Sequence, residues 1–267
     1  MSNNTENHIE NNTEHTPKTI KVWDLPVRIF HWSLVVLFIA AYVTNSLGSD
    51  YFVYHLWSGY ALIILVSFRI VWGLVGTYHA RFTHFVKNPV ATAKYALSVF
   101  KKRDKHYLGH NPLGAVMVFI LLVAILVQAI TGLFTNDEIF NVGPLYAYIN
   151  DELSLQLTSL HRQLFYWILG AIALHILAVI FHVVLKRDNI VRAMFSGKKN
   201  LPTSDDSQPP SEASQLSSTA SQPSSKDDQV SISSSKIGLA IVILIVLIAI
   251  LAAVILTAPE AVTEMEY

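Results

Sequence analysis

The chain has 267 residues, of which 52% are hydrophobic and 14% charged, and its formal net charge at pH 7 is zero. Soluble domains carry about 25% charged residues, so this composition excludes an ordinary soluble domain and indicates a membrane protein. The zero net charge by itself says nothing about nucleic acid, and we expect no nucleic-acid partner for this membrane protein. The absence of cysteine excludes disulfides, thiolate metal sites and covalent c-type haem attachment.

Five apolar runs are long enough to cross a bilayer, whose hydrocarbon core of roughly 30 Å needs about 20 residues of helix. They lie near residues 28–47, 53–76, 113–134, 163–185 and 237–258. No long stretch alternates with a period of two, so a β-barrel has no support. We therefore predict an all-α membrane protein, with a four-helix transmembrane bundle and a fifth, C-terminal transmembrane helix.

The lysines and arginines predict the orientation, because short loops rich in these residues stay in the cytoplasm. They precede the first span, fill the connection between the second and third, and follow the fourth. The connections at 48–52 and 135–160 carry acidic residues and neither lysine nor arginine. We expect the N-terminus to be cytoplasmic, and the acidic loops and the C-terminus to lie outside.

The chain divides by composition. The polar residues 1–17 are typical of a disordered tail, and a Ser- and Pro-rich stretch at 200–236 is typical of a flexible cytoplasmic linker. The bundle then occupies 18–199, the fifth helix 237–258 and a short outer tail 259–267. The fifth helix has no side chain suited to hold a cofactor, so we interpret it as an anchor or a partner-docking helix.

Histidines in the apolar spans are the strongest functional signal, because a polar side chain is costly there. His161 and His175 are 14 residues apart, nearly four helical turns, so they share a face and stand roughly 21 Å apart along the axis. Depth in the membrane then predicts an outer and an inner pair of imidazoles. These pairs are His55 with His161 and His31 with His175. His182 competes with His175 as the inner partner of His31.

Two imidazoles that face each other across a helix bundle are typical of bis-histidine haem ligation, in which both axial positions are filled and the iron passes single electrons. Arg69 and Arg162 are suited to pair with haem propionates, although snorkelling to the lipid headgroups explains them equally well. The rival interpretation is a histidine-lined metal or proton transporter. Such proteins generally add carboxylates inside the membrane, and the first four spans contain none.

Several segments carry a resemblance to a known family: "VWDLPVRIFHW" (22–32), "YHLWSGY" (54–60), "FRIVWGLVGTYHARF" (68–82), "GHNPLG" (109–114) and "LHILAVIFH" (174–182). Together they resemble the bacterial cytochrome b561 family, whose superfamily includes the b-type cytochrome subunits of nickel–iron hydrogenases. The resemblance covers about residues 18–199. Its histidine pattern matches His31, His55, His161 and His175, and it implies two non-covalent b haems in a bacterial inner membrane.

The resemblance also implies electron transfer between the quinone pool and a partner on the outer face. We expect a quinone site near the inner haem, and a periplasmic c-type cytochrome or redox enzyme as the partner. The alternative is a subunit that anchors a hydrogenase or another dehydrogenase. Whether the chain itself oxidises quinol or reduces quinone, and whether it forms a homodimer, is left open. In the segment "WDLP" we expect a structural role, with Asp24 as the helix N-cap and Pro26 in the first turn.

Overall fold

A computed structural model of the chain describes residues 19–85, 88–100, 112–185, 190–200 and 236–259. Five of its helices are long and apolar enough to cross a membrane, which confirms the predicted fold class. They are α1 (Leu25–Ser46), α2 (Phe52–Val75), α5 (Pro112–Gly132), α6 (Asp151–Val184) and α8 (Ile237–Leu256). The tail predicted at 1–17, nearly all of the linker at 200–236 and all but the first residue of the tail at 259–267 lie outside the described residues.

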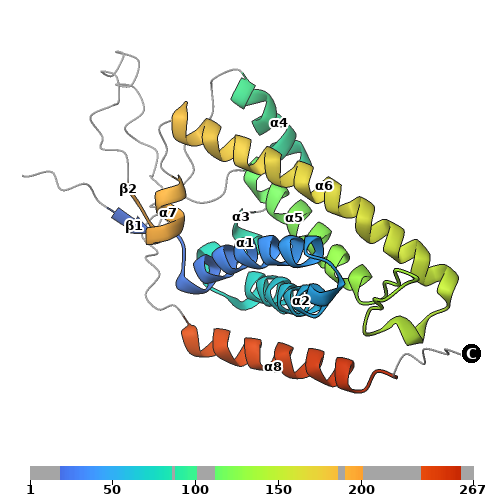
Figure 1. The fold of residues 1–267 in the computed structure, drawn as a ribbon. Helices are drawn as coiled ribbons and strands as arrows, with labels where there is room; N and C mark the ends of the chain where they lie inside the picture. Colours follow the sequence, from blue (N-terminus) through green and yellow to red (C-terminus); the bar gives the residue numbers. More distant parts are fainter. Residues whose placement is uncertain (1–18, 86–87, 101–111, 186–189, 201–235, 260–267) are drawn as a thin grey trace, which may run out of the picture.

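Helices α1 and α2 form an antiparallel pair at the centre of the protein (Figure 1). Asp24 begins α1 as predicted, because its carboxylate accepts a hydrogen bond from the backbone N–H of Val27 at 2.9 Å and satisfies one of the unpaired donors of the first turn. The tight connection to α2 passes through Gly48, whose φ of 98° favours glycine, and a short 3-10 turn at Ser49–Tyr51.

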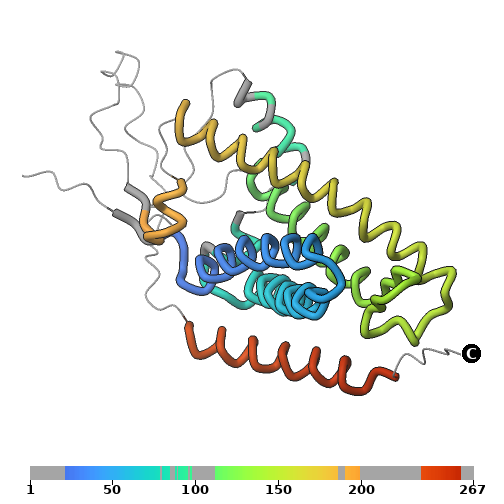
Figure 2. Tube along the Cα trace, viewed as in Figure 1, coloured from blue at the N-terminus to red at the C-terminus, as the bar shows by residue number. Residues whose placement is uncertain are grey.

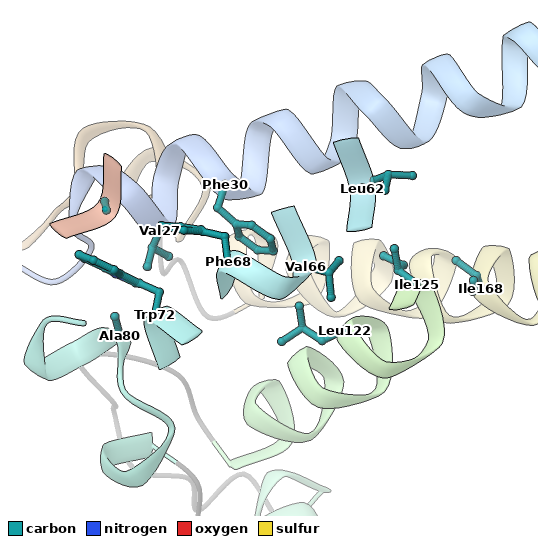
Figure 3. Close-up of a cluster of buried hydrophobic side chains, with 11 residues drawn as sticks. Val27, Phe30, Leu62, Val66, Phe68, Trp72, Ala80, Leu122, Ile125 and Ile168 are labelled. Atoms are coloured by element: carbon teal, nitrogen blue, oxygen red, sulfur yellow. The ribbon is translucent and has the colours of Figure 1, made fainter. Parts of the chain in front are cut away.

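Helix α5 packs against both α2 and α6, and the close-up in Figure 3 shows the apolar core in which the four helices meet. Burial of these side chains supplies the attraction that holds α2 to its neighbours, because their apolar surface is removed from lipid and water alike and their atoms are closely packed. The labelled core residues are Val27, Phe30, Leu62, Val66, Phe68, Trp72, Ala80, Leu122, Ile125 and Ile168.

Helix α6 begins earlier than the sequence predicts. The apolar pattern placed the fourth span at 163–185 and treated 135–160 as a loop, but the helix starts at Asp151, behind an Asn150 side chain that accepts from the N–H of Leu153 at 2.8 Å. At about 1.5 Å per residue its 34 residues extend well beyond a bilayer core of roughly 30 Å. Its first turns, in which leucines are interspersed with polar residues, therefore extend past the continuous apolar span.

Short elements close the end of the bundle at which α1 begins and α2 ends. This end is called the inner end, after the orientation that the basic residues predict. The short elements at this end are the strands β1 (Thr19–Lys21) and β2 (Lys198–Asn200), the 3-10 turn at Tyr78–Ala80, and the helices α3 (Phe82–Phe85), α4 (Pro89–Phe100) and α7 (Ile190–Ser196). The two strands pair antiparallel, and the N–H of Val22 donates to the carbonyl of Gly197 at 2.8 Å. No pattern in the sequence predicted these short elements.

Helix α8 runs along α2, and in the tube of Figure 2 it lies on the opposite side of the α1–α2 pair from α6. Ala240 is buried in this contact. At one end the Lys236 ammonium donates to the carbonyls of Val75 and Gly76, at 3.4 Å each. At the other end the Tyr148 hydroxyl, from the loop before α6, donates to the carbonyl of Thr257 at 3.3 Å. The fifth helix is therefore antiparallel to α2 and contacts the bundle at both of its ends.

Candidate cofactor site

The structure brings together the two histidines predicted as the outer pair. His55 lies in the first turn of α2 and His161 three turns into α6, and their ring centroids are 6.3 Å apart with the ring planes nearly perpendicular. Both side chains are half-buried. The two rings therefore lie close together in the space between two helices that are far apart in the chain.

Each outer histidine is oriented by a backbone carbonyl. Nδ1 of His55 donates to the carbonyl of Ala41 at 2.9 Å, and Nδ1 of His161 donates to that of Gln128 at 2.8 Å. Because a carbonyl only accepts, the proton of a neutral ring must sit on Nδ1, which leaves the lone pair on Nε2. In metal-binding histidines, a hydrogen bond from the ring nitrogen that does not bind the metal commonly fixes the tautomer and the orientation of the ring.

The geometry of this pair fits one iron between the two rings. An imidazole nitrogen that binds a transition metal at about 2 Å leaves its ring centroid about 3 Å from the metal, so two rings on opposite sides stand roughly 6 Å apart. The measured centroid separation is 6.3 Å. Among the described residues no group of three or more histidine, aspartate or glutamate side chains could hold a bare metal ion.

Helix α5 holds His161 closely. A Cβ added at Gly132 would lie 2.9 Å from Cε1 and 3.3 Å from Nδ1 of His161, so only a glycine leaves the ring where it is. The hydroxyl of Thr131 lies 3.3 Å from the same Nδ1. No sequence pattern indicates either residue, because neither glycine nor threonine is typical of a cofactor site by itself.

The two histidines predicted as the inner pair, His31 of α1 and His175 of α6, lie within electrostatic range of each other. Nδ1 of His31 is buried and has no hydrogen-bond partner among the described residues, in contrast to the outer histidines. His182 lies seven residues beyond His175, and its Nδ1 donates to the carbonyl of Ala178 in its own helix at 2.9 Å.

The two predicted arginines differ in burial. Arg69 is 2% exposed, lies with its guanidinium 4.8 Å from the ring centroid of Phe82, and has no hydrogen-bond partner for Nη1 among the described residues. A buried guanidinium nitrogen without an acceptor suits an anionic group from outside the chain. Arg162 is exposed and interacts electrostatically with the neighbouring His161.

Asp24 has a larger role than the predicted helix cap. Its side chain is 1% exposed, and Oδ2 accepts from the indole N–H of Trp72 at 3.0 Å and from the hydroxyl of Thr77 at 2.6 Å. The carboxylate also interacts electrostatically with Arg69. It therefore joins the start of α1 to the end of α2 beside the buried guanidinium.

The acidic outer loop has its own internal order. Asp137 accepts hydrogen bonds from the backbone N–H groups of Ile139, Phe140 and Asn141 and from the amide of Asn141. Partial burial opposes ionisation, but these hydrogen bonds outweigh it and lower the pKa of Asp137 to about 2. The loop so formed presents Ile139 and Phe140 as its most exposed apolar side chains.

Comparison with known proteins identifies one family. The model of the family described as prokaryotic cytochrome b561 matches residues 22–197. Three curated relatives bear the name of a probable Ni/Fe-hydrogenase b-type cytochrome subunit. The proteins of Rhodobacter capsulatus, Bradyrhizobium diazoefficiens and Escherichia coli K12 are 27%, 24% and 23% identical, over 68%, 68% and 67% of this chain and 81%, 86% and 90% of their own lengths. No solved structure matches. Helix α8 lies beyond the region that the family model covers.

Proposed function

The chain belongs to the prokaryotic cytochrome b561 family, and from this membership we propose that it is a dihaem b-type cytochrome that carries electrons across the bacterial inner membrane. It exchanges them between the quinone pool on the inner side and a redox partner on the outer face. The N-terminus is cytoplasmic and the C-terminus periplasmic, as the distribution of basic residues supports.

The observation that carries this proposal is the pair His55 and His161. Their centroid separation of 6.3 Å fits one iron, and both Nδ1 atoms donate to carbonyls, which leaves Nε2 of each ring to bind metal. His31 and His175 form the second pair. Since the four histidines come from only three helices, α6 contributes one ligand to each haem.

In this proposal the protein binds, orients and shields its cofactors. When bound, haem b supplies single-electron chemistry between its two iron oxidation states. The four histidines are the residues that would hold the two haems through Nε2 and would keep other ligands away from the iron. Arg69 pairs with a propionate of the inner haem through its unpartnered Nη1. Arg162, exposed beside His161, pairs with a propionate of the outer haem.

Two kinds of outer partner are consistent with the site. The acidic loop, without lysine or arginine between 135 and 160, supports a basic periplasmic partner such as a c-type cytochrome. The names of the relatives support the second candidate, a subunit that delivers electrons from a hydrogenase or another dehydrogenase. In either role the partner is a redox enzyme or carrier at the outer end.

Single histidine substitutions test the proposal. We expect wild-type protein in detergent to contain two protohaems per chain in the pyridine-haemochrome assay. His55→Ala and His161→Ala should each lose the outer haem, and His31→Ala and His175→Ala the inner haem, so each variant retains one. His182→Ala is the matched control and should retain both. A variant of His182 that loses a haem while His175→Ala keeps two would move the inner ligand to His182, and well-expressed protein without haem would contradict the whole proposal.

A further inference from the structure

The carbonyl that orients His161 is shared with a second donor. The oxygen of Gln128 accepts from Nδ1 of His161 at 2.8 Å and from the hydroxyl of Thr131 at 2.9 Å. That hydroxyl also lies 3.3 Å from Nδ1 of His161 and 2.8 Å from the carbonyl of Val127. The Thr131 side chain is only 5% exposed. Two donors therefore share one oxygen in a buried part of the protein.

The same arrangement recurs at His55, on a different helix. The carbonyl of Ala41 accepts from Nδ1 of His55 at 2.9 Å and from the hydroxyl of Thr44 at 3.2 Å. In both helices the threonine stands three residues after the shared carbonyl, in "AYVT" (41–44) and "QAIT" (128–131). A helical threonine can bond the carbonyls three and four residues back. Here one of those carbonyls is, in each case, the one that orients an outer histidine.

Sharing the acceptor weakens the hydrogen bond from each histidine, because both donors draw on the electron density of one oxygen. A hydrogen bond from Nδ1 makes an imidazole a more basic ligand, and a more basic axial ligand favours the oxidised form of the iron. A threonine hydroxyl on the same carbonyl opposes this effect. Each hydroxyl therefore raises the reduction potential of an iron that the histidine binds.

We propose that Thr44 and Thr131 are positioning residues that raise the reduction potential of the outer haem, through His55 and His161 respectively. This inference rests on the proposed function and deepens it, because it assigns the residues that adjust one of the two centres. The rival explanation is that each hydroxyl only satisfies its own hydrogen-bonding capacity within its helix. In that case removing the hydroxyl changes stability and leaves the potential where it was.

Valine in place of either threonine removes the hydroxyl and keeps a β-branched side chain. The full chain, loaded with haem and reconstituted in lipid nanodiscs, is titrated optically through the potentials of both haems, and the outer wave is the one that His55→Ala loses. We expect Thr44→Val and Thr131→Val each to raise the ratio of oxidised to reduced outer haem, at a fixed ambient potential, by about threefold, near the lower end of what one hydrogen bond contributes. At about 59 mV per tenfold for one electron, this ratio is a downward shift of roughly 30 mV.

Thr257→Val is the matched control. The Thr257 hydroxyl also bonds the carbonyls four and three residues back, at 2.8 and 3.4 Å, but it lies at the end of α8, which contains no histidine. Thr44→Ser and Thr131→Ser keep a hydroxyl and should retain the wild-type potential. The inner haem should keep its potential in every variant, because Nδ1 of His31 has no hydrogen-bond partner in the part of the chain that the structure describes.

Haem content and the EPR spectrum of the oxidised protein, which reports the orientation of the axial rings, separate the possible results. A lowered outer potential in the valine variants, with two haems, an unchanged EPR signal and the wild-type potential in the serine variants, supports the proposal. An unchanged or raised outer potential overturns it, and so does an equal shift in the serine variants.

The two threonines also test each other, because they act on different ligands of one iron. If one valine variant lost its outer haem, the potential of the other would decide. Loss of the outer haem from both valine variants would overturn the proposal, because the hydroxyls would then be needed to hold the rings. Wild-type protein without two haems would contradict the proposed function itself, and the role of these threonines with it.

Discussion

Replacing Gly132 with alanine tests the outer haem assignment most directly. The new Cβ would lie 2.9 Å from Cε1 of His161, whereas ordinary contacts begin at 3.4 Å, so the ring has to move by about half an ångström. Metal–ligand distances hold to within about 0.2 Å. The ring is also anchored to Gln128 by a 2.8 Å hydrogen bond, which resists such a movement.

We therefore expect Gly132→Ala to weaken binding of the outer haem by about 10- to 100-fold, the range seen when the support of a metal ligand is disturbed. Purified protein should contain about one haem per chain in the pyridine-haemochrome assay, where wild type contains two in our proposal. Gly170→Ala is the control, because a Cβ there would meet nothing within 4 Å. If Gly132→Ala kept its full haem content, its spectrum and its midpoint potentials, the assignment of His161 as a tightly positioned ligand would be wrong.

Two further predictions concern the protein around the site. Asp24→Ala should lower the free energy of unfolding, measured by detergent denaturation, by about 3 kcal/mol. The substitution removes a helix cap and leaves the buried donors of Trp72 and Thr77 unpaired. A loss below about 1 kcal/mol would show that water replaces the carboxylate. The pKa of Asp137 is lowered to about 2 in the folded loop, below about 4 for a free aspartate, so its contribution to loop stability is complete above pH 4 and is lost as the pH falls toward 2. Pepsin cleavage within 138–140, normalised to an unfolded substrate, should therefore rise between pH 4 and 2 in wild type, and Asp137→Asn should already be cleaved at pH 4.

The parts of the structure that could be predicted from the sequence depend on the pattern of residues within one continuous segment. Apolar run length located all five membrane helices, and the helical repeat placed His161 and His175 on one face of α6. The start of α6 was misplaced because its first three turns, residues 151–160, intersperse leucines with polar residues and so form no continuous apolar run. Hydrophobicity indicates where a helix enters lipid, and it carries no information about a helix that continues beyond the membrane.

The parts that could not be predicted depend on contacts between distant segments. The carbonyls of Ala41 and Gln128 orient the outer histidines, yet every residue has a carbonyl, so no residue type marks them. Asp24 was identified as a helix cap from its local sequence, but its bonds to Trp72 and Thr77 span 48 and 53 residues. The contact of α7 with Trp32 depends in the same way on the pairing of two strands, Thr19–Lys21 and Lys198–Asn200, that lie far apart in the sequence.

Because His161 and His175 lie on one uninterrupted helix, the distance between them does not depend on the composition of the bilayer. Membrane thickness changes with lipid and temperature, and transmembrane helices respond by tilting. Tilting α6 moves both histidines together and leaves the roughly 21 Å of helix between them unchanged. In our proposal the gap that electrons cross between the two centres is thus set by the rise of a single α-helix, and a change in membrane thickness leaves it constant.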